Sequence, residues 1–386
     1  MHFPGTLDDL PTPALLIDLD VVKRNSAAMA SRFESLGVAL RPHLKTAKAV
    51  EVARLATRGH GGGLTVSTLA EAAFFAQAGF RDITWAVTAV PARLAAADEI
   101  QRTQAAVIGL IADDPELAGA LGAEAARLGT RFRVHVEIDS GEHRTGLAWD
   151  DPLVRTTAGV IHAHPALELA GVLTHGGHAY GSFDPVEIAR IAEEERLAVV
   201  RAAGRLREAG LPCDVVSAGS TPTAIHGRRF DGLTEFRPGV YTLFDLAQVA
   251  RHCCRIEDIA VAVLTTVLSR QPRHDRAIVD AGALAVSKDL SAAGALPDTG
   301  YGWLVARDGN TRVGNLHLEQ LDQEHGYATG SPEDLDSLRP LQRLRVLPNH
   351  ACITAACHDA FWVVSGGQVV DRWPRVSGWE ADREDA

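Results

Sequence analysis

Short apolar runs alternate with longer segments of helical periodicity between residues 38 and 236. An apolar run bounded by turn-forming residues predicts a buried strand, whereas apolar residues three or four positions apart predict a helix. Eight strands separated by helices predict a (β/α)8 TIM barrel rather than an open sheet. The expected strands are residues 38–41, 63–66, 82–86, 106–111, 132–138, 167–174, 214–217 and 233–236. The expected helices are residues 47–58, 68–78, 91–103, 115–128, 151–162 and 185–208, with a short one after Thr221.

The pattern changes near residue 251. The run 14–18 predicts a strand, and a single helix at 19–36 separates it from the first barrel strand, so we expect the N-terminus to pair with the C-terminal domain. The sequence therefore predicts a barrel domain at residues 19–250 and a mostly-β domain built from residues 1–18 and 251–386. Strands of this second domain are expected at residues 259–269, 276–280, 344–347, 361–365 and 368–372.

Composition and charge fit an enzyme that acts on small molecules. The chain has 386 residues, of which 46% are hydrophobic and 23% charged, and its formal net charge is −11. This acidic balance argues against a nucleic-acid partner, which favours a basic face. No secretory signal is visible, no apolar stretch is long enough to span a membrane, and the five cysteines show no disulfide pattern. A cytoplasmic location with no membrane partner is expected.

Lys45 is the first candidate for chemistry. It follows the first predicted strand, within the segment 41–46, and barrel enzymes carry their active sites at the C-terminal ends of the strands. A lysine that forms a Schiff base needs such a partly dehydrated position, where its amine can lose a proton. The alternative is an ordinary surface lysine.

Two glycine-containing loops favour a phosphorylated ligand. Barrel enzymes often bind phosphate with the loops after strands seven and eight, which here are residues 217–223 and 237–241. Glycines let backbone N–H groups approach an anion, and hydroxyl groups add donors. Each loop alone is a weak signal, but both stand at the expected strands.

Arg144 and His175 are further candidates, because they follow the fifth and sixth predicted strands. Each could contact a cofactor. Equally, Arg144 could pair with Asp139, and His175 could be a core histidine with satisfied hydrogen bonds.

His350 and Cys352 are candidate metal ligands. In an extended segment, residues two apart face the same side, so both side chains could reach one ion. Imidazole and thiolate form a borderline-soft pair that suits Zn²⁺. Two protein ligands are few for a structural zinc, whereas a catalytic zinc leaves positions for substrate and water. The alternative is a free cysteine beside an unrelated histidine, and Cys357 and His358 are weaker additional candidates.

Together these segments resemble a known family. Over nearly its whole length the chain is similar to the fold-type III pyridoxal-phosphate enzymes, in the group of D-serine dehydratase-like and D-threonine aldolase-like proteins, distant relatives of alanine racemase. The resemblance implies an alanine racemase-like N-terminal barrel and a homodimer. It rests on residues 12–14, 41–46, 63–69 with Glu71, 219–223, 239–241, 280–282, 323–326, 348–352 and 377–379.

The resemblance also implies roles for individual residues. Lys45 would carry pyridoxal 5′-phosphate as a Schiff base, and Arg144 and Tyr180 would lie against the pyridine ring or its 3′-oxygen. His350 and Cys352 would bind the metal. The full set of implied cofactor-binding residues is Lys45, Arg144, His175, Tyr180, Ser220, Thr221, Gly239, Val240 and Tyr241, of which Ser220, Thr221, Gly239 and Val240 would hold the phosphate.

Within the family, the metal pair separates two activities. Aldolase members show His-x-Asp and use Mn²⁺ or Mg²⁺, whereas dehydratase members show His-x-Cys, as this chain does. The resemblance therefore implies a zinc-dependent carbon–oxygen lyase that converts a 3-hydroxy D-amino acid (D-threo-3-hydroxyaspartate, D-serine or D-threonine) into a 2-oxo acid and ammonia. The alternatives are a metal-dependent D-threonine or 3-hydroxy-D-aspartate aldolase, an amino-acid racemase, and a non-catalytic pyridoxal-phosphate-binding protein.

Overall fold

The computed structural model describes residues 5–61 and 63–379, and the chain divides into two compact units. We call one the barrel unit, mainly residues 29–239, and the other the β unit, residues 1–28 and 240–375. The sequence-based domain limits, at residues 18 and 250, stay a prediction, and the outer ends of the predicted β domain lie outside the described residues. None of the helices within the described ranges has the length and apolarity to cross a membrane.

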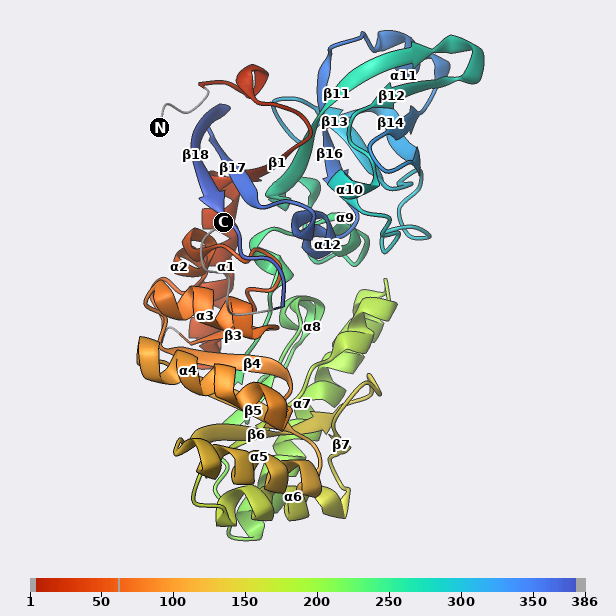
Figure 1. The fold of residues 1–386 in the computed structure, drawn as a ribbon. Coiled ribbons are helices and arrows are strands. Elements are labelled where there is room, and N and C mark those ends of the chain that lie inside the picture. The colour runs from red at the N-terminus through yellow and green to blue at the C-terminus, as the bar shows by residue number, and fades with distance from the viewer. Residues whose placement is uncertain (1–4, 62, 380–386) are drawn as a thin grey trace. The chain divides into compact units, whose positions relative to one another are not determined.

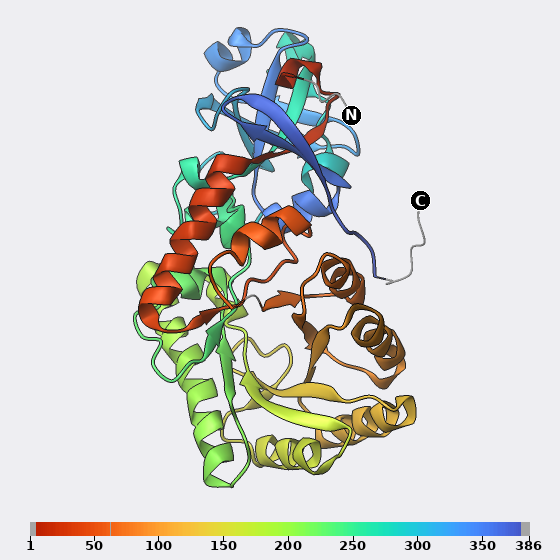
Figure 2. The same ribbon diagram turned by 90° about the vertical axis from the view of Figure 1, so that its left-hand side faces the viewer.

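Eight parallel strands form the wall of the barrel unit, in the order β2, β10, β9, β8, β6, β5, β4, β3 (Figures 1 and 2). An isolated parallel bridge between His43, just after β2, and Thr65 of β3 joins the two ends of this order. The predicted (β/α)8 fold is thereby confirmed. The strands are β2 (Ala39–Leu40), β3 (Leu64–Val66), β4 (Asp82–Thr88), β5 (Val107–Ala112), β6 (Phe132–Asp139), β8 (Leu167–Leu173), β9 (Val215–Ala218) and β10 (Glu235–Phe236), with a short β7 (Leu147–Ala148) beside β6.

Three helices of the barrel unit begin with the same Asp-Pro pair. The carboxylate of Asp114, Asp151 or Asp184 accepts a hydrogen bond from a backbone N–H of the first helical turn, and the proline that follows occupies the first turn. An N-cap carboxylate satisfies otherwise unpaired N–H groups, and proline is tolerated there because it has no N–H to lose. These helices are α5 (Pro115–Leu128), α6 (Pro152–Ala163) and α7 (Pro185–Glu208); the others are α2 (Val50–Ala56), α3 (Leu69–Gln77), α4 (Leu94–Gln104) and α8 (Thr221–His226).

Some predicted limits were wrong for identifiable reasons. Strands β2 and β10 have only two residues each because Pro42 and Pro238, which lack an N–H donor, follow one residue beyond them. The helix expected at residues 47–58 begins only at Val50, since Lys48 adopts a left-handed backbone with φ of 52°. Helix α1 (Leu19–Leu36) matches its predicted limits.

The β unit contains a nine-stranded sheet. Strand β12 pairs with both β15 and β11, so six of the strands close into a ring in the order β12, β15, β14, β13, β16, β11. The three strands β13, β14 and β15 were missed by the sequence analysis. The strands are β1 (Ala14–Asp18), β11 (Val261–Gln271), β12 (Arg276–Val279), β13 (Gly302–Ala306), β14 (Arg312–Leu321), β15 (Gly326–Thr329), β16 (Arg343–Pro348), β17 (Ala360–Ser365) and β18 (Gln368–Pro374).

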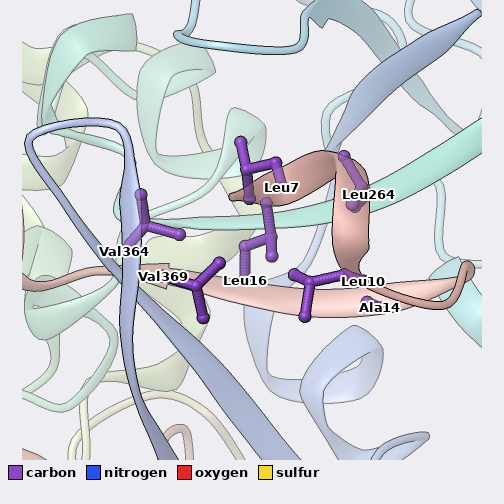
Figure 3. Close-up of a cluster of buried hydrophobic side chains, with 7 residues drawn as sticks. All are labelled: Leu7, Leu10, Ala14, Leu16, Leu264, Val364 and Val369. Carbon is purple, nitrogen blue, oxygen red and sulfur yellow. The ribbon is translucent and has the colours of Figure 1, made fainter. Parts of the chain in front are cut away.

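Strand β1 ties the N-terminal segment into the β unit, as predicted. It pairs antiparallel with β11 and parallel with β17. Figure 3 shows the apolar cluster that forms around this junction, with side chains from the N-terminal segment, from β11 and from the β17–β18 hairpin packed together. The cluster consists of Leu7, Leu10, Ala14, Leu16, Leu264, Val364 and Val369.

An ion-pair network lies within the barrel unit, around Arg41. The Arg41 guanidinium donates to Glu235 over 2.7 Å and to Asp82 over 2.6 Å. A side chain at Gly63 would collide with this guanidinium, since a Cβ there would lie 2.5 Å from Cζ of Arg41. Burial alone would raise the pKa of Glu235, but Arg41 and the Ser217 hydroxyl hold it below its ordinary value.

We expect Arg41→Ala to lower the free energy of unfolding by about 3–5 kcal/mol, because it leaves the buried Glu235 without its cation. Since the pKa of Glu235 is lowered in the folded state, this contribution is present above the pKa of an unfolded carboxyl and is lost as the pH falls through the folded pKa. Denaturant unfolding at neutral and acidic pH measures both effects. The control is Arg133→Ala, which removes a more exposed partner of Asp82 at 3.6 Å and should cost less than about 1 kcal/mol. Equal losses in the two variants would contradict this account.

Candidate functional site

A cavity of about 340 Å³ opens in the barrel unit. That volume lies within the range of small-molecule and cofactor sites. Its lining residues come from the C-terminal ends of the strands or directly follow them, as the sequence analysis expected for the active site of a barrel. They are His43, Lys45, Ser67, Ala86, Val87, Thr88, Ile111, Glu137, Arg144, Thr145, Leu173, His175, Gly219 and Arg237.

Lys45 lines this cavity and is half-buried, which favours the active-site interpretation, and its role stays a prediction. It forms no salt bridge with any residue in the described ranges, whereas Lys48, three positions on, is paired with Glu71 at 3.1 Å. Its backbone N–H lies 3.4 Å from Nδ1 of His43. The cavity therefore holds an amine without a fixed counter-ion, which is the group needed to form a Schiff base with an aldehyde.

Two histidines beside Lys45 are held neutral. Burial, with the nearby charge of Lys45, keeps the pKa of His43 well below its ordinary value. The same two causes lower the pKa of His175 to about 3. Nδ1 of His175 lies 2.9 Å from the carbonyl oxygen of Gly219, and because a carbonyl can only accept, the single proton of the neutral ring is on Nδ1.

Arg237 and Glu137 also line the cavity. The sequence analysis placed Arg237 in the predicted loop 237–241 but named neither as an individual site residue. Arg237 is 5% exposed, and its guanidinium donates to the Ser217 hydroxyl and to the carbonyl of Thr174. Glu137 is 7% exposed, and burial raises its pKa. In each case a charged residue stands at or directly after the C-terminal end of a predicted barrel strand, and that position is the signal that could have identified both.

Two further predicted residues, Arg144 and Tyr180, differ in whether they line the cavity. Arg144 lines the cavity and pairs with Glu142 at 3.3 Å, whereas Asp139 instead pairs with His143 at 2.6 Å. Tyr180 lies beside His175 with 6.4 Å between ring centroids, but it is not among the cavity-lining residues.

The two predicted phosphate loops approach each other closely. Gly239 donates its N–H to the Thr221 hydroxyl over 3.3 Å, and Ser220 is the N-cap of α8. Gly219 has φ of 133°, and a Cβ there would lie 2.5 Å from the backbone nitrogen of Arg237. A Cβ on Gly239 would lie 2.7 Å from the carbonyl oxygen of His43. Only glycine fits at these two positions, which brings backbone and hydroxyl donors together beside the cavity.

Val240 and Tyr241 belong to the β unit rather than the barrel unit. Both are buried. The Tyr241 hydroxyl has no hydrogen-bond partner in the described part of the chain, and burial raises its pKa. Their assignment to the cofactor stays a prediction.

A helix start, and not an extended segment, brings His350 and Cys352 together, so that part of the sequence argument was wrong. His350 is the N-cap of α12 (Ala351–Ala356), and Cys352 lies in its first turn. Although burial lowers the pKa of His350, hydrogen bonds with Asp289 and Cys352 raise it to about 11. Nδ1 of His350 lies 3.0 Å from the Asp289 carboxylate, which leaves Nε2 for another partner. A carboxylate behind a histidine is the usual support of a histidine that binds a metal.

Cys357 and His358 do not join this pair. They line a different cavity of the β unit, and Nε2 of His358 bonds to the carbonyl of Ala285 over 2.9 Å. Across residues 5–61 and 63–379, no group of three or more His, Cys, Asp or Glu side chains is arranged to hold a metal ion.

Comparison with known proteins identifies relatives over the whole chain. Residues 17–247 match the family model described as alanine racemase, N-terminal domain, and residues 260–364 match the putative serine dehydratase domain. The chain is 43% identical to the D-threo-3-hydroxyaspartate dehydratase of Delftia sp. (strain HT23), covering 97% of this chain and 99% of that protein. It is 29% identical to the D-serine dehydratase of Dictyostelium discoideum (97% and 98% covered) and 28% identical to the D-threonine aldolase of an Arthrobacter species (96% and 93% covered).

Solved structures agree with these matches. The Delftia sp. HT23 dehydratase superposes with a TM-score of 0.94 at 41% identity, covering 97% of this chain and 100% of that chain. A cysteine-to-alanine variant of a D-threo-3-hydroxyaspartate dehydratase, solved in a metal-free form, superposes with a TM-score of 0.93 at 41% identity and with the same coverage.

Proposed function

The chain belongs to the fold-type III pyridoxal-phosphate enzymes, among the D-serine dehydratase-like and D-threonine aldolase-like proteins, and we propose that it is a D-amino acid dehydratase, a carbon–oxygen lyase. The proposed reaction converts a 3-hydroxy D-amino acid into a 2-oxo acid and ammonia: water is lost across Cα–Cβ, and one water is taken up again when the nitrogen is released by hydrolysis. Candidate substrates are D-threo-3-hydroxyaspartate, D-serine and D-threonine. The observation that carries the proposal is the His350–Cys352 pair in a chain whose Lys45 lines the barrel cavity. We propose further that the enzyme works as a homodimer in the cytoplasm, as its family implies.

The cavity residues fit pyridoxal phosphate. Lys45 provides an amine without a salt bridge, and Gly219 and Gly239 let the two loops approach so closely that a Cβ at either would collide with neighbouring backbone. The cofactor, when bound, supplies an electron-withdrawing ring that stabilises negative charge at the substrate Cα. Lys45 would hold the cofactor and then take the proton from Cα. The neutral His43 and His175 add no positive charge to the cavity, so that, apart from Lys45, the cations on its wall are Arg144 and Arg237.

The donor set at His350 fits zinc. Imidazole and thiolate together are borderline-soft ligands, and Asp289 orients the imidazole by binding Nδ1. The 3-hydroxyl group of the substrate is a poor leaving group by itself, and zinc would supply the Lewis acid that activates it. The metal-free form known for a relative supports a metal in this family. Zn²⁺ itself is our proposal.

We expect purified enzyme to release ammonia and a 2-oxo acid from at least one of D-threo-3-hydroxyaspartate, D-serine and D-threonine. Breaking Cβ–O gives these products, whereas an aldolase breaks Cα–Cβ and gives glycine and an aldehyde. Parallel assays of ammonia and glycine compare the two reactions, with the L-isomers as controls. Glycine as the main product would contradict the dehydratase proposal, and interconversion of D- and L-isomers without ammonia would indicate a racemase.

Lys45→Ala should abolish the visible absorbance of the lysine-bound cofactor and lower kcat by about 100-fold to 10,000-fold, because it removes both the attachment point and the base. The matched control is Lys48→Ala, three positions along the same segment, where the amine is engaged by Glu71. That variant should keep the absorbance. A Lys45→Ala protein with an unchanged spectrum would show that the cofactor is attached elsewhere or not at all.

Removing the metal with a chelator should abolish ammonia release, and adding Zn²⁺ should restore it, because the 3-hydroxyl is activated only by the ion. Metal analysis should find the zinc content lost in Cys352→Ala. It should be unchanged in Cys357→Ala, which alters an exposed thiol outside the pair. Activity that is indifferent to chelation and to Cys352→Ala would leave His350 and Cys352 with a structural role only.

A further inference from the structure

Glu195 is a fully buried carboxylate in the barrel unit that the proposed mechanism does not use. It lies on α7 and is 0% exposed. Its two acidic neighbours, Glu193 and Glu194, are partly exposed and pair with Arg196 and Arg190. Carboxylates are almost never fully buried unless they are paired or hydrogen-bonded. No salt bridge to Glu195 is formed within the described residues, so its hydrogen bonds must justify its burial.

The periodicity of the buried positions along α7 places Glu195 on the buried face of the helix. Glu195 falls in the stripe of buried positions that repeats every three or four residues along α7. Burial raises the pKa of Glu195, and its hydrogen bonds oppose that rise. The other buried residues of α7 are Ile188, Ile191, Ala192, Arg196, Ala198, Val199, Ala202, Ala203 and Leu206.

One oxygen of Glu195 joins two loops of the cavity wall. Oε1 accepts the N–H of Gly176 over 2.6 Å and the N–H of Gly219 over 2.9 Å. Gly176 belongs to the loop after β8, and Gly219 to the loop after β9. The bond from Nδ1 of His175 to the carbonyl of Gly219, at 2.9 Å, joins the same two loops from the other side. Both peptide groups flanking Gly219 are therefore held.

Capping contacts continue this arrangement into the predicted phosphate loop. The hydroxyl of Thr223 donates to the carbonyl of Ser220 over 3.3 Å and lies close enough to Glu195 to oppose the rise of its pKa. Oγ of Ser220 lies 2.9 Å from Oγ1 of Thr223, and the N–H of Ser220 donates to that same oxygen over 3.1 Å. Glu195 therefore holds Gly219 directly, and the contacts between Ser220 and Thr223 continue from it along the loop.

The local backbone fits around the carboxylate. A Cβ on Gly176 would lie 2.8 Å from Cδ of Glu195, and Gly219 has φ of 133°. Any larger residue at Gly176 would displace the carboxylate, and any other residue at Gly219 would strain the turn. Gly176 is therefore required by the contact with Glu195, and Gly219 by its left-handed backbone and its close approach to Arg237.

We propose that Glu195 is a positioning residue that holds the loop Gly219–Thr223 and His175 in the geometry required to bind the phosphate group of the cofactor. This inference rests on the proposed function, because it assumes a phosphorylated cofactor in this cavity. Glu195 acts through the loop, since it does not line the cavity and its Oε1 accepts the N–H groups of Gly176 and Gly219, while Oε2 has no hydrogen-bond partner among the described residues. Its effect should therefore depend on whether the ligand carries a phosphate group.

The test compares pyridoxal phosphate with pyridoxal, which lacks the phosphate, by equilibrium binding to cofactor-free enzyme. Glu195→Ala should weaken binding of pyridoxal phosphate by about 10-fold to 100-fold, because several hydrogen bonds to one charged group are lost. Binding of pyridoxal should change less than about threefold, because the loop that is released holds only the phosphate. For each variant we take the ratio of its affinity for pyridoxal phosphate to its affinity for pyridoxal. Comparing this ratio with that of the wild type cancels the intrinsic difference in affinity between the two ligands.

Two variants separate positioning from general stability. Glu195→Gln keeps a carbonyl oxygen that accepts both N–H bonds, so its affinity ratio should stay close to that of the wild type. Glu194→Ala, which alters the neighbouring exposed carboxylate, should leave both affinities unchanged. If Glu195→Ala does not fold, as judged by thermal unfolding, the same binding comparison is made with Glu195→Asp. Its shorter side chain should still produce the selective loss of affinity.

Equal weakening of both ligands in Glu195→Ala or Glu195→Asp would overturn the proposal and assign Glu195 a general structural role. An unchanged ratio in a folded variant would overturn it as well. If the wild type binds neither ligand, the proposed function fails first. If the wild type binds pyridoxal phosphate normally but substitution of Glu195 has no selective effect, only this inference is rejected.

Discussion

The ion pair between Arg41 and Glu235 lies within the barrel unit, where water screens neither charge well. Glu235 in turn accepts the hydroxyl proton of Ser217 over 2.6 Å, and Ser217 accepts a hydrogen bond from Arg237. A continuous series of polar contacts thus runs from Asp82 to the cavity. Because each charge in the series needs its neighbour, the position of Arg237 on the cavity wall depends on residues that never touch the cavity.

The pairing of buried charges also determines which groups in the cavity are reactive. Arg41, Glu235 and Arg237 are held by neighbours, and Glu195 by backbone N–H groups, whereas Lys45 has no salt bridge among the described residues. The positive charge of Lys45 contributes to keeping His43 and His175 neutral. What results is one reactive amine, two neutral imidazoles and two guanidinium groups, those of Arg144 and Arg237. That combination suits a cofactor that binds an amine through its aldehyde and carries an anionic phosphate group.

Much of the barrel could be predicted because parallel strands are buried on both faces and form continuous apolar runs. Lys45 and the glycine loops could be located from their place after particular strands. Strand β14 could not, since its first half is partly or fully exposed, Glu319 and Gln320 are exposed, and it lacks a clear apolar pattern. The partner of His350 could not be found either, because Asp289 lies 61 residues earlier and only tertiary folding brings them together. Glu195 stands in a run of three glutamates that is typical of a solvated helix face, although its phase with Ile188 and Ile191 was a usable signal.

Which substrate bond breaks is the central question, and carbon labelling answers it most directly. Substrate labelled with ¹³C at both Cα and Cβ is incubated with the zinc-loaded enzyme, and the products are followed by ¹³C NMR. Our account predicts that the one-bond coupling between the two labelled carbons persists in a 2-oxo acid, because only Cβ–O and C–N bonds are broken. Separate uncoupled signals from glycine and an aldehyde would show that Cα–Cβ is cleaved and would contradict it.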